Sequence, residues 1–459
     1  MDTSGPREFE TQVSAFRGHQ LAQLSDVPET VVKALGALYI SDAEQLVAVA
    51  SVDGTDKLLA KQLRISVKEL QSVVSAARAV VTDAHVSELE SPGEYDLSTG
   101  AFEPTDEILA EVQALPMLTV EDVPVALPAS VNWVRRMPPV RNQAARGTCV
   151  AFALTALHEF HTQTEGQPRD FSEQHLYYET KQIDGASSSC GTWLVKAVRA
   201  LADRGQCREE VWAYNPNAPC NNHGAAPPNA RTDGVAFRLE TRAVASKDVK
   251  EIKSALAAGG VVPFSIPVYD SWYRSAATRN TGRITMRIGN EQASGGHAMC
   301  LVGYQDDESA PGGGYFILRN SWGSWAAQSP YGAGYGTIPY QYIATDCWET
   351  FTAIRERGRT QKIAAGQSQP GVGWQAYTGP GGPGIYIDVD TSSGEFRATP
   401  VYVTSLGGTS THWALTGGSA VYDATPTGFR IAVRFANGAP ITPTMASTNG
   451  WHVTWIGIE

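Results

Sequence analysis

Apolar residues recur at helical spacing in the first part of the chain. One such series is Leu70, Val73, Val74 and Ala77. Residues spaced in this way lie on one face of a helix. Ser66 and Glu69 have the spacing of a capping box, in which the serine hydroxyl and the glutamate bond the first free amides of a helix, and Ser41 and Glu44 repeat it. We therefore predict a small helical module over residues 1–82.

Alternating apolar and polar residues dominate the other end of the chain. Glycine-rich turns separate the alternating runs, which are residues 385–390, 399–404, 429–435 and 451–456. Alternation of this kind is typical of strands that are buried on one face. Short strands at this spacing predict an antiparallel β-sandwich over residues 374–459. Residues 358–373 are predicted to be a linker in front of it.

The central region, residues 129–357, mixes both patterns. An apolar run with helical spacing follows Cys149, so we predict a helix that starts at this cysteine. One strand-like run starts at His297 and a second ends at Asn320. Helices and strands together in this region, with a helical module before it and a sandwich after it, indicate a multidomain α+β protein.

Charge is distributed unevenly along the chain. The whole chain holds 36 Lys and Arg against 47 Asp and Glu, a formal net charge of −11. Residues 1–128 hold 8 basic and 21 acidic side chains (8 − 21 = −13), and the remainder holds 28 and 26 (28 − 26 = +2). Eleven acidic residues stand between Asp83 and Asp122 with no lysine or arginine, among several prolines. Residues 83–128 are therefore predicted to be an acidic connector, mostly extended.

Composition excludes several classes of protein. An acidic chain with a pI near 5.4 is a poor candidate for nucleic-acid binding, and no apolar run is long enough to span a bilayer. The first twenty residues include Arg7, Glu8 and Arg17, so they lack the apolar core of a secretory signal. We expect a cytoplasmic protein, with export by a signal-less route as the alternative.

Three residues could form a catalytic centre. A cysteine at the first turn of a helix, as predicted for Cys149, faces free amides and the positive end of the helix dipole, which favours the thiolate. His297 follows Gly295 and Gly296, which permit close approach. A Cys–His pair needs a third group to orient the imidazole, and the carboxamide of Asn320 is suited to that task.

These motifs resemble the papain-like cysteine peptidases of the C1 type. The matching segments are residues 131–133, 142–143, 147–149, 151–152, 171–174, 295–297, 320–323 and 334–336. They occur in the family's order, with 148 residues from Cys149 to His297 and 23 from His297 to Asn320. The resemblance implies a two-lobed catalytic domain over residues 129–357, with a helical lobe and a β-barrel-like lobe.

The resemblance also implies a role for each matching residue. Cys149 would be the nucleophile and His297 the proton shuttle. Asn320 would orient His297, and Trp322 would shield their hydrogen bond from water. Gln143 would donate to the oxyanion together with the backbone N–H of Cys149.

Three glycines are expected to bind substrate. Gly191 resembles the residue whose backbone pairs with the substrate strand. Gly295 and Gly296 would leave the neighbouring pocket wall small, so that a bulky apolar side chain could lie two residues before the cleaved bond. The resemblance implies no cofactor, only a reduced Cys149.

The chain departs from the family at its cysteines. Most members carry, at the position of Arg146, a cysteine that is bonded to another near position 190, and with Arg146 there Cys190 cannot make that bond. Free thiols at Cys190, Cys207 and Cys220 are expected, with a Cys207–Cys220 bridge as an alternative. A zinc site formed by the three cysteines and His223 is the weakest alternative, because their spacing lacks the paired short intervals of such sites.

Both flanking regions invite hypotheses. The acidic connector precedes a stretch with four arginines (Arg135, Arg136, Arg141 and Arg146), so we predict that it covers part of the groove and restrains the enzyme; an unattached linker is the alternative. Residues 34–41 and 63–66 resemble a helix–hairpin–helix module, for which a protein contact is favoured over DNA because the module is acidic. The sandwich loosely resembles the H-type lectins, and its aromatic residues predict a carbohydrate ligand, a protein ligand or a structural role. They are Trp374, Tyr377, Tyr386, Trp413, Tyr422, Trp451 and Trp455.

The sequence as a whole therefore predicts a cysteine endopeptidase. It would be restrained by its N-terminal region, targeted by its C-terminal domain, and would act on a protein or peptide substrate. The alternatives are a binding or adhesion protein with a degenerate papain-like scaffold, and a Cys/His transpeptidase or amidase on a non-protein substrate.

Overall fold

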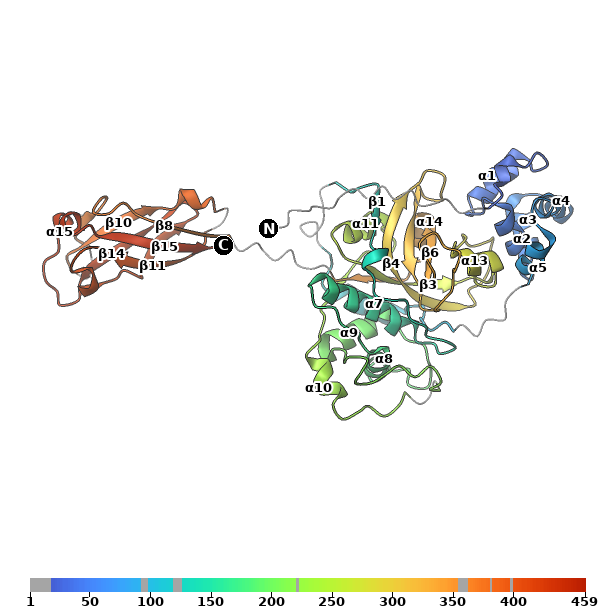
Figure 1. Cartoon of the computed structure of the whole chain (residues 1–459), viewed down its shortest axis with the longest axis horizontal. Helices are drawn as coiled ribbons and strands as arrows, with labels where there is room; N and C mark the ends of the chain where they lie inside the picture. Colours follow the sequence, from blue (N-terminus) through green and yellow to red (C-terminus); the bar gives the residue numbers. More distant parts are fainter. Residues whose placement is uncertain are drawn as a thin grey trace. The chain divides into compact units, whose positions relative to one another are not determined.

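The computed structural model of the protein describes residues 18–91, 98–118, 126–219, 223–353, 362–379, 382–396 and 399–459. They form two compact units, residues 1–355 and residues 356–459. The first unit contains a helical module, an intervening segment and a larger domain with a helical and a sheet-rich lobe (Figure 1).

The helical module is built from short helices whose apolar faces meet in one core. They are η1 (Leu21–Gln23), α1 (Glu29–Gly36), α2 (Ala43–Ala50), α3 (Thr55–Leu63), α4 (Val67–Arg78) and α5 (Asp83–Leu89). The predicted capping box of Ser66 and Glu69 starts α4. The other predicted capping box does not form, because α2 starts one residue later and the Gln45 N–H donates to the carboxylate of Asp42 (2.9 Å). The module continues past the predicted boundary at residue 82, because Leu89 is buried in the same core.

The helical lobe of the larger domain surrounds α7 (Cys149–Thr164). Every residue of α7 from Cys149 to Phe160 is buried, because other helices and the sheet pack around it. These helices are α8 (Glu173–Lys181), α9 (Leu194–Arg204) and α10 (Ala230–Val235). A helix enclosed in this way has no polar face, which explains the dense apolar run after Cys149.

The second lobe is an antiparallel sheet with the strand order β2-β7-β3-β4-β5-β6, and β1 pairs with β4. The strands are β1 (Ser130–Asn132), β2 (Arg242–Ala243), β3 (Val262–Val268), β4 (Gly295–Asp306), β5 (Gly314–Arg319), β6 (Tyr335–Pro339) and β7 (Glu349–Thr352). The helices of this lobe are η3 (Val134–Arg136), α11 (Val249–Ala257), α12 (Asp270–Tyr273), α13 (Ala276–Thr281) and α14 (Tyr340–Asp346). Cys300 on β4 lies opposite Arg319 on β5. This register brings the start of β4 and the end of β5, and with them His297 and Asn320, to the same edge of the sheet.

Residues 98–118, here called the strap, lie along the larger domain. Ala101 forms a parallel bridge with Thr192, and Met117 forms one with Ala243. Between these points α6 (Asp106–Gln113) packs against α9. The strap is the largest described part of residues 83–128, the region that the sequence predicts to be an acidic connector.

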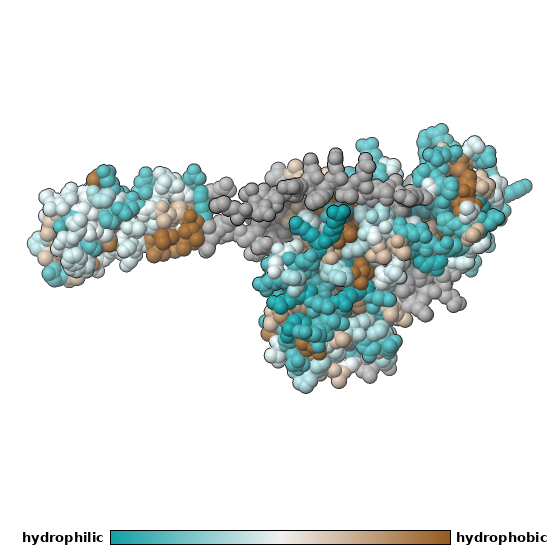
Figure 2. Space-filling view, viewed as in Figure 1, coloured by the Kyte–Doolittle hydropathy of each residue, from teal (hydrophilic) through white to brown (hydrophobic). Residues whose placement is uncertain are grey.

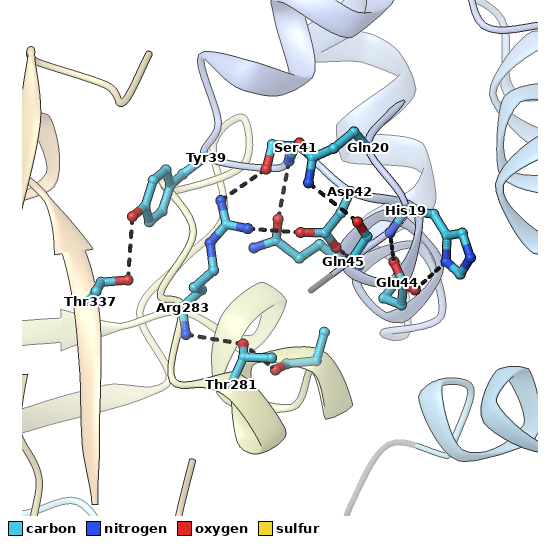
Figure 3. Close-up of polar contacts among 12 residues, drawn as sticks. His19, Gln20, Tyr39, Ser41, Asp42, Glu44, Gln45, Thr281, Arg283 and Thr337 are labelled. Atoms are coloured by element: carbon cyan, nitrogen blue, oxygen red, sulfur yellow. Dashed lines mark hydrogen bonds and ion pairs between the residues drawn. The ribbon is translucent and has the colours of Figure 1, made fainter. Parts of the chain in front are cut away.

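The helical module docks on the sheet-rich lobe through buried polar contacts (Figure 3). Arg283 Nη1 donates to the carboxylate of Asp42 (2.8 Å), and Arg283 Nη2 donates to the Ser41 hydroxyl (3.0 Å). The Tyr39 hydroxyl donates to Thr337 Oγ1 (3.4 Å). Both side chains of the Asp42–Arg283 ion pair are nearly inaccessible to water, so the module is packed closely against the domain.

The second unit consists of two antiparallel sheets around one apolar core. One sheet has the order β12-β14-β10-β9, with β13 paired to β14, and the other has the order β11-β15-β8. The elements are β8 (Ile363–Gln367), β9 (Gln375–Tyr377), β10 (Gly384–Asp390), η4 (Ser392–Gly394), β11 (Val401–Gly407), η5 (His412–Ala414), β12 (Leu415–Thr416), β13 (Val421–Thr425), β14 (Gly428–Phe435), α15 (Pro443–Thr448) and β15 (His452–Ile458). Strand β8 lies inside the range predicted to be a linker, so this unit starts earlier than the sequence suggested.

The aromatic residues of the second unit divide into two groups. Trp374, Trp451 and Trp455 are buried in the core, whereas Trp413 and Tyr422 are exposed. The outer face of the sheet of β11, β15 and β8 carries an apolar patch, which lies at one end of the second unit (Figure 2). Its exposed apolar side chains are Ile363, Val401, Val403 and Ile456.

Membrane-spanning helices were also sought. In the part of the chain that the structure describes, no helix is both long enough and apolar enough to cross a bilayer.

Candidate active site

Cys149 is the first residue of α7 and is fully buried. The Ala298 N–H donates a hydrogen bond to its sulfur (3.4 Å). Burial raises the pKa of the thiol to about 11, although the backbone N–H groups of Ala298 and Gly100 lower it. A thiol with this pKa is protonated at neutral pH, so in this state of the molecule Cys149 is not a thiolate.

His297 and Asn320 are hydrogen-bonded as the sequence predicts. The Asn320 side-chain oxygen lies 2.8 Å from His297 Nε2. Because an amide oxygen only accepts, Nε2 carries the proton and Nδ1 is the free base of the neutral ring. Trp322 stacks on the imidazole, with ring centroids 4.4 Å apart. Burial lowers the pKa of His297 to about 4, so the ring is neutral here.

Gln143 lies on the loop in front of α7 and is fully buried. Its Nε2 donates to the carbonyl oxygen of Ser98 (2.8 Å) and to that of Arg146 (3.0 Å). Its Oε1 accepts from the Ser321 hydroxyl (2.6 Å). The side chain is therefore fixed with one amide N–H directed at the Ser98 carbonyl of the strap and the other at the Arg146 carbonyl, and a fixed N–H donor of this kind suits an oxyanion site.

The strap covers the site with its main chain. The N–H groups of Gly100 and Ala101 both donate to the carbonyl oxygen of Gly296 (3.0 Å each). The Phe102 N–H donates to the Thr192 carbonyl, and the Thr192 N–H donates to the Gly100 carbonyl (2.9 Å each). The strap therefore runs parallel to the backbone at Thr192, close to Cys149.

Small residues make this close approach possible. A Cβ atom added at Gly100 would overlap the carbonyl group of Gly147.

Away from the site, Glu111 of α6 forms ion pairs with Lys196 (2.7 Å) and Arg199 (3.1 Å) of α9. The sequence predicted that arginines near residue 140 would attract the connector, but the described contacts are with basic residues of α9.

The pairing of Gly191 with a substrate strand stays a prediction, and the described backbone bonds to the strap are those of its neighbour. Thr192 makes both backbone bonds to the strap, whereas a Cβ atom at Gly191 would overlap the ring of Phe102. The Gly191 carbonyl instead accepts from Lys181 Nζ (2.9 Å). Sequence reasoning missed Thr192, because the family resemblance marks this segment by its glycine.

The absence of side chains at Gly295 and Gly296 lets other groups approach closely. A Cβ atom at Gly296 would overlap the ring of Trp348 and the carbonyl oxygen of Ala101, and one at Gly295 would meet the Thr99 hydroxyl. The predicted substrate-binding role of the two glycines stays a prediction. Sequence reasoning did not single out Trp348, because no motif marks it.

The cysteines differ from expectation. Cys190 is disulfide-bonded, whereas Cys149, Cys207, Cys300 and Cys347 are free and buried. The expected free thiol at Cys190 and the alternative Cys207–Cys220 bridge are therefore both wrong, and Cys220 itself lies outside the described residues.

The zinc alternative also loses its ligands. A bridged Cys190 has no thiolate to offer, and in the described residues no cluster of three or more His, Cys, Asp or Glu is arranged to hold a metal ion.

Together these residues form a thiol hydrolase constellation. A buried thiol at a helix start lies beside a strand that carries an oriented histidine, and a fixed amide donor lies on the adjoining loop. Such an arrangement supports attack on a carbonyl carbon, stabilisation of the oxyanion and proton transfer to the leaving group.

Comparison with known proteins agrees with this geometry. Residues 127–338 match the family model "Papain family cysteine protease". An uncharacterized peptidase C1-like protein of Acanthamoeba polyphaga mimivirus is 25% identical over 45% of this chain, which spans 65% of that protein. Peptidase 1 of Dermatophagoides farinae is 27% identical over 54% of this chain and 74% of its own length.

One solved structure found by the comparison is xylellain, a cysteine protease from Xylella fastidiosa. It is 25% identical, covers 56% of this chain and 96% of its own, and has a TM-score of 0.47.

Residues 127–338 are a papain-family cysteine protease domain of the C1 type, a family of hydrolases. The predicted papain-like domain is thereby confirmed, and the degenerate-scaffold alternative is not favoured.

Proposed function

We propose that the whole chain is a cysteine endopeptidase. Cys149 Sγ attacks the substrate carbonyl carbon, and the oxyanion accepts from Gln143 Nε2 and the Cys149 N–H. His297, oriented by Asn320 and shielded by Trp322, takes the thiol proton of Cys149 on Nδ1 and passes it to the leaving amine. It then takes a proton from the water that attacks the thioester and returns it to Cys149 Sγ as the acid product leaves. The observation that carries this proposal is the 2.8 Å hydrogen bond between His297 and Asn320. The N–H of Ala298, the residue after His297, donates to the Cys149 sulfur, so the thiol lies beside this pair.

We also propose that the strap restrains this activity. Two observations support this role. The strap occupies the donors of Gln143 and Thr192 and places the Gly100 N–H against the buried Cys149 sulfur, and burial leaves both Cys149 and His297 neutral. Water reaching the site after the strap leaves removes the cause of both pKa shifts, and a thiolate–imidazolium pair then becomes favourable.

Intact mass after incubation with an epoxide that alkylates papain-type thiols tests the catalytic proposal. One adduct on the wild-type chain and none on Cys149→Ala is expected. Cys300→Ala is the matched control, because Cys300 is an equally buried free thiol outside the site, and it should label like wild type. An adduct that persists in Cys149→Ala, or no adduct even after the strap is displaced, contradicts the proposal.

The flanking regions are proposed to direct the enzyme rather than to catalyse. The docked helical module supports a protein-contact role over DNA binding, since its contacts with the catalytic domain are apolar and ionic. The second unit is proposed to bind a partner. Trp413 and Tyr422 are its exposed aromatic residues available to a sugar, and loss of glycan-array binding in Trp413→Ala would support a carbohydrate over a protein ligand.

The disulfide of Cys190 supports the exported alternative over the cytoplasmic one, because disulfides persist in oxidising compartments. Thiol titration of the denatured, unreduced protein tests this: a titre that includes every cysteine would favour the cytoplasm.

A further inference from the structure

Arg146 is a buried cation on the loop directly before the nucleophile. It is 2% exposed. Its Nη1 donates to the Gln174 side-chain oxygen (2.7 Å) and to the Asn215 carbonyl (3.0 Å), so its partners are neutral. The guanidinium lies over the rings of Tyr177 (4.6 Å) and Tyr214 (5.7 Å). Two aromatic faces therefore replace much of the stabilisation that water gives this charge.

Arg146 and Tyr214 connect both ends of the loop that holds the oxyanion donors. The Tyr214 hydroxyl donates to the Gln143 carbonyl (3.0 Å) and shares a hydrogen bond with Thr148 Oγ1 (2.7 Å). The Arg146 carbonyl accepts from Gln143 Nε2 (3.0 Å) and from the Thr148 N–H (2.8 Å). Hydrogen bonds to Tyr214 and to the Arg146 carbonyl therefore hold both Gln143 and Thr148, the residue before Cys149.

The loop needs such a brace because its backbone is strained. Ala144 has a φ of 54°, in the left-handed region that residues with a Cβ atom adopt only at a cost. A strained conformation persists when its surroundings impose it. If the loop relaxed, Gln143 Nε2 would no longer be held in its present direction, toward the Ser98 carbonyl.

We propose that Arg146, acting with Tyr214, is a positioning residue for the oxyanion site. Its flat guanidinium stacks on the two tyrosine rings while its backbone carbonyl orients the amide of Gln143. Lysine cannot replace it, because an ammonium group has neither the planar face nor the fork of donors. The inference rests on the proposed function of Cys149.

The test separates reactions at Cys149 that use an oxyanion site from one that does not. A peptide aldehyde joins Cys149 Sγ to its carbonyl carbon and places its oxygen in the oxyanion site. Iodoacetamide alkylates the same sulfur with loss of iodide, and no oxyanion forms. Arg146→Met, Arg146→Lys and Tyr214→Phe are compared in the full-length chain carrying Gly100→Glu, which displaces the strap. Arg231→Met, an exposed arginine, is the matched control.

Arg146→Met is expected to lower kcat on a dipeptidyl methylcoumarylamide and to weaken aldehyde inhibition, both by about 10- to 100-fold, since one oxyanion donor is worth 100-fold or more. KM should stay within about threefold of its value in the Gly100→Glu chain. The iodoacetamide rate should do so too, because no oxyanion forms in that alkylation. Arg146→Lys should not restore kcat or aldehyde affinity. Tyr214→Phe should lower both by a smaller factor, again with little change in the iodoacetamide rate.

An equal fall in aldehyde affinity and alkylation rate, or no fall in either, would overturn the inference. If Arg146→Met does not fold, Tyr214→Phe decides the question, because it removes only a hydroxyl. If the Gly100→Glu chain is alkylated by iodoacetamide and binds the aldehyde but cleaves no peptide, the proposed endopeptidase function is contradicted. The comparison of aldehyde affinity with alkylation rate still tests the role of Arg146.

Discussion

The strap and the helical module both contact the catalytic domain, but through different interactions. Around Cys149 the strap contributes backbone hydrogen bonds and very small side chains, such as those of Gly100 and Ala101. The module instead shares an apolar core with the domain, in which Ala277 and Ile288 are buried among module residues.

Backbone bonds exchange with water at a modest net cost. Separating an apolar core costs much more. The difference indicates that the part of the strap around Cys149 can be displaced, whereas the module and the far part of the strap, where Ile108 and Leu118 are buried in the domain's cores, stay in place.

The largest expected effect comes from breaking the module's ion pair. Arg283→Met leaves the Asp42 carboxylate buried without its cation, so the free energy of unfolding should fall by about 3–5 kcal/mol in denaturant titrations. Arg274→Met, which removes an exposed pair with Asp270, should change it by less than about 1 kcal/mol. Equal effects of the two variants would mean that the module is only loosely attached.

Displacing the strap should have a smaller energetic effect but a large effect on activity. The side chain of Gly100→Glu would overlap the Gly147 carbonyl. We expect Cys149 alkylation and peptide cleavage to rise about 10- to 100-fold, where each factor of ten corresponds to about 1.4 kcal/mol. Glu103→Gln, which alters an exposed side chain of the same strap, should leave both rates unchanged. Unchanged rates in Gly100→Glu would show that the strap does not restrain the enzyme.

Acid should favour opening of the strap. Burial lowers the pKa of His297 to about 4, whereas a solvated histidine titrates near 6.5; if opening of the strap lets water reach the ring, its pKa rises toward that value. The open state therefore binds more protons between these values, and the stability of the closed state is present at higher pH and lost as the pH falls. The opening constant should rise by at most about tenfold per pH unit below 6.5.

Hydrogen-exchange protection factors of residues 98–102 measure this equilibrium in Cys149→Ala, which cannot turn over. The pH dependence should flatten in the Cys149→Ala/His297→Gln double variant. An unchanged slope in that variant would assign the titration to another group.

The smallest effect concerns the module away from its interface. Ser66→Ala removes the capping box of α4 and should cost about 1 kcal/mol of stability, seen as a small shift of the denaturation midpoint. The rate of Cys149 alkylation should not change. A faster rate would mean that the stability of the module controls how often the strap leaves Cys149.

Much of the catalytic centre was predictable because it depends on residue type and order. Cys149 begins a helix, His297 begins a buried strand and Asn320 follows another, and each position could be recognised from local apolar periodicity and neighbouring glycines. The backbone bonds to the strap are made by Thr192, next to Gly191, and could not be predicted, because a backbone hydrogen bond leaves no mark on the side chain.

Contacts between distant segments were not predictable. Nothing local distinguishes Gly100 from a linker glycine, yet it lies against Gly147. In the sequence Arg146 is only a departure from the family pattern, because Tyr177 and Tyr214, whose rings lie beside its guanidinium, are distant in the chain.

The sequence by itself determined the division into helical, mixed and alternating regions, and the three residues of the proposed catalytic triad. These follow from periodicity and chemical type, which are properties of neighbouring positions. Three features depend on tertiary contacts: the strap bonds Gly296 and Thr192 beside Cys149, the module is held through Asp42 and Arg283, and burial leaves Cys149 and His297 neutral. Burial and charge pairing arise when segments far apart in the chain meet, so they have no signature within any one segment.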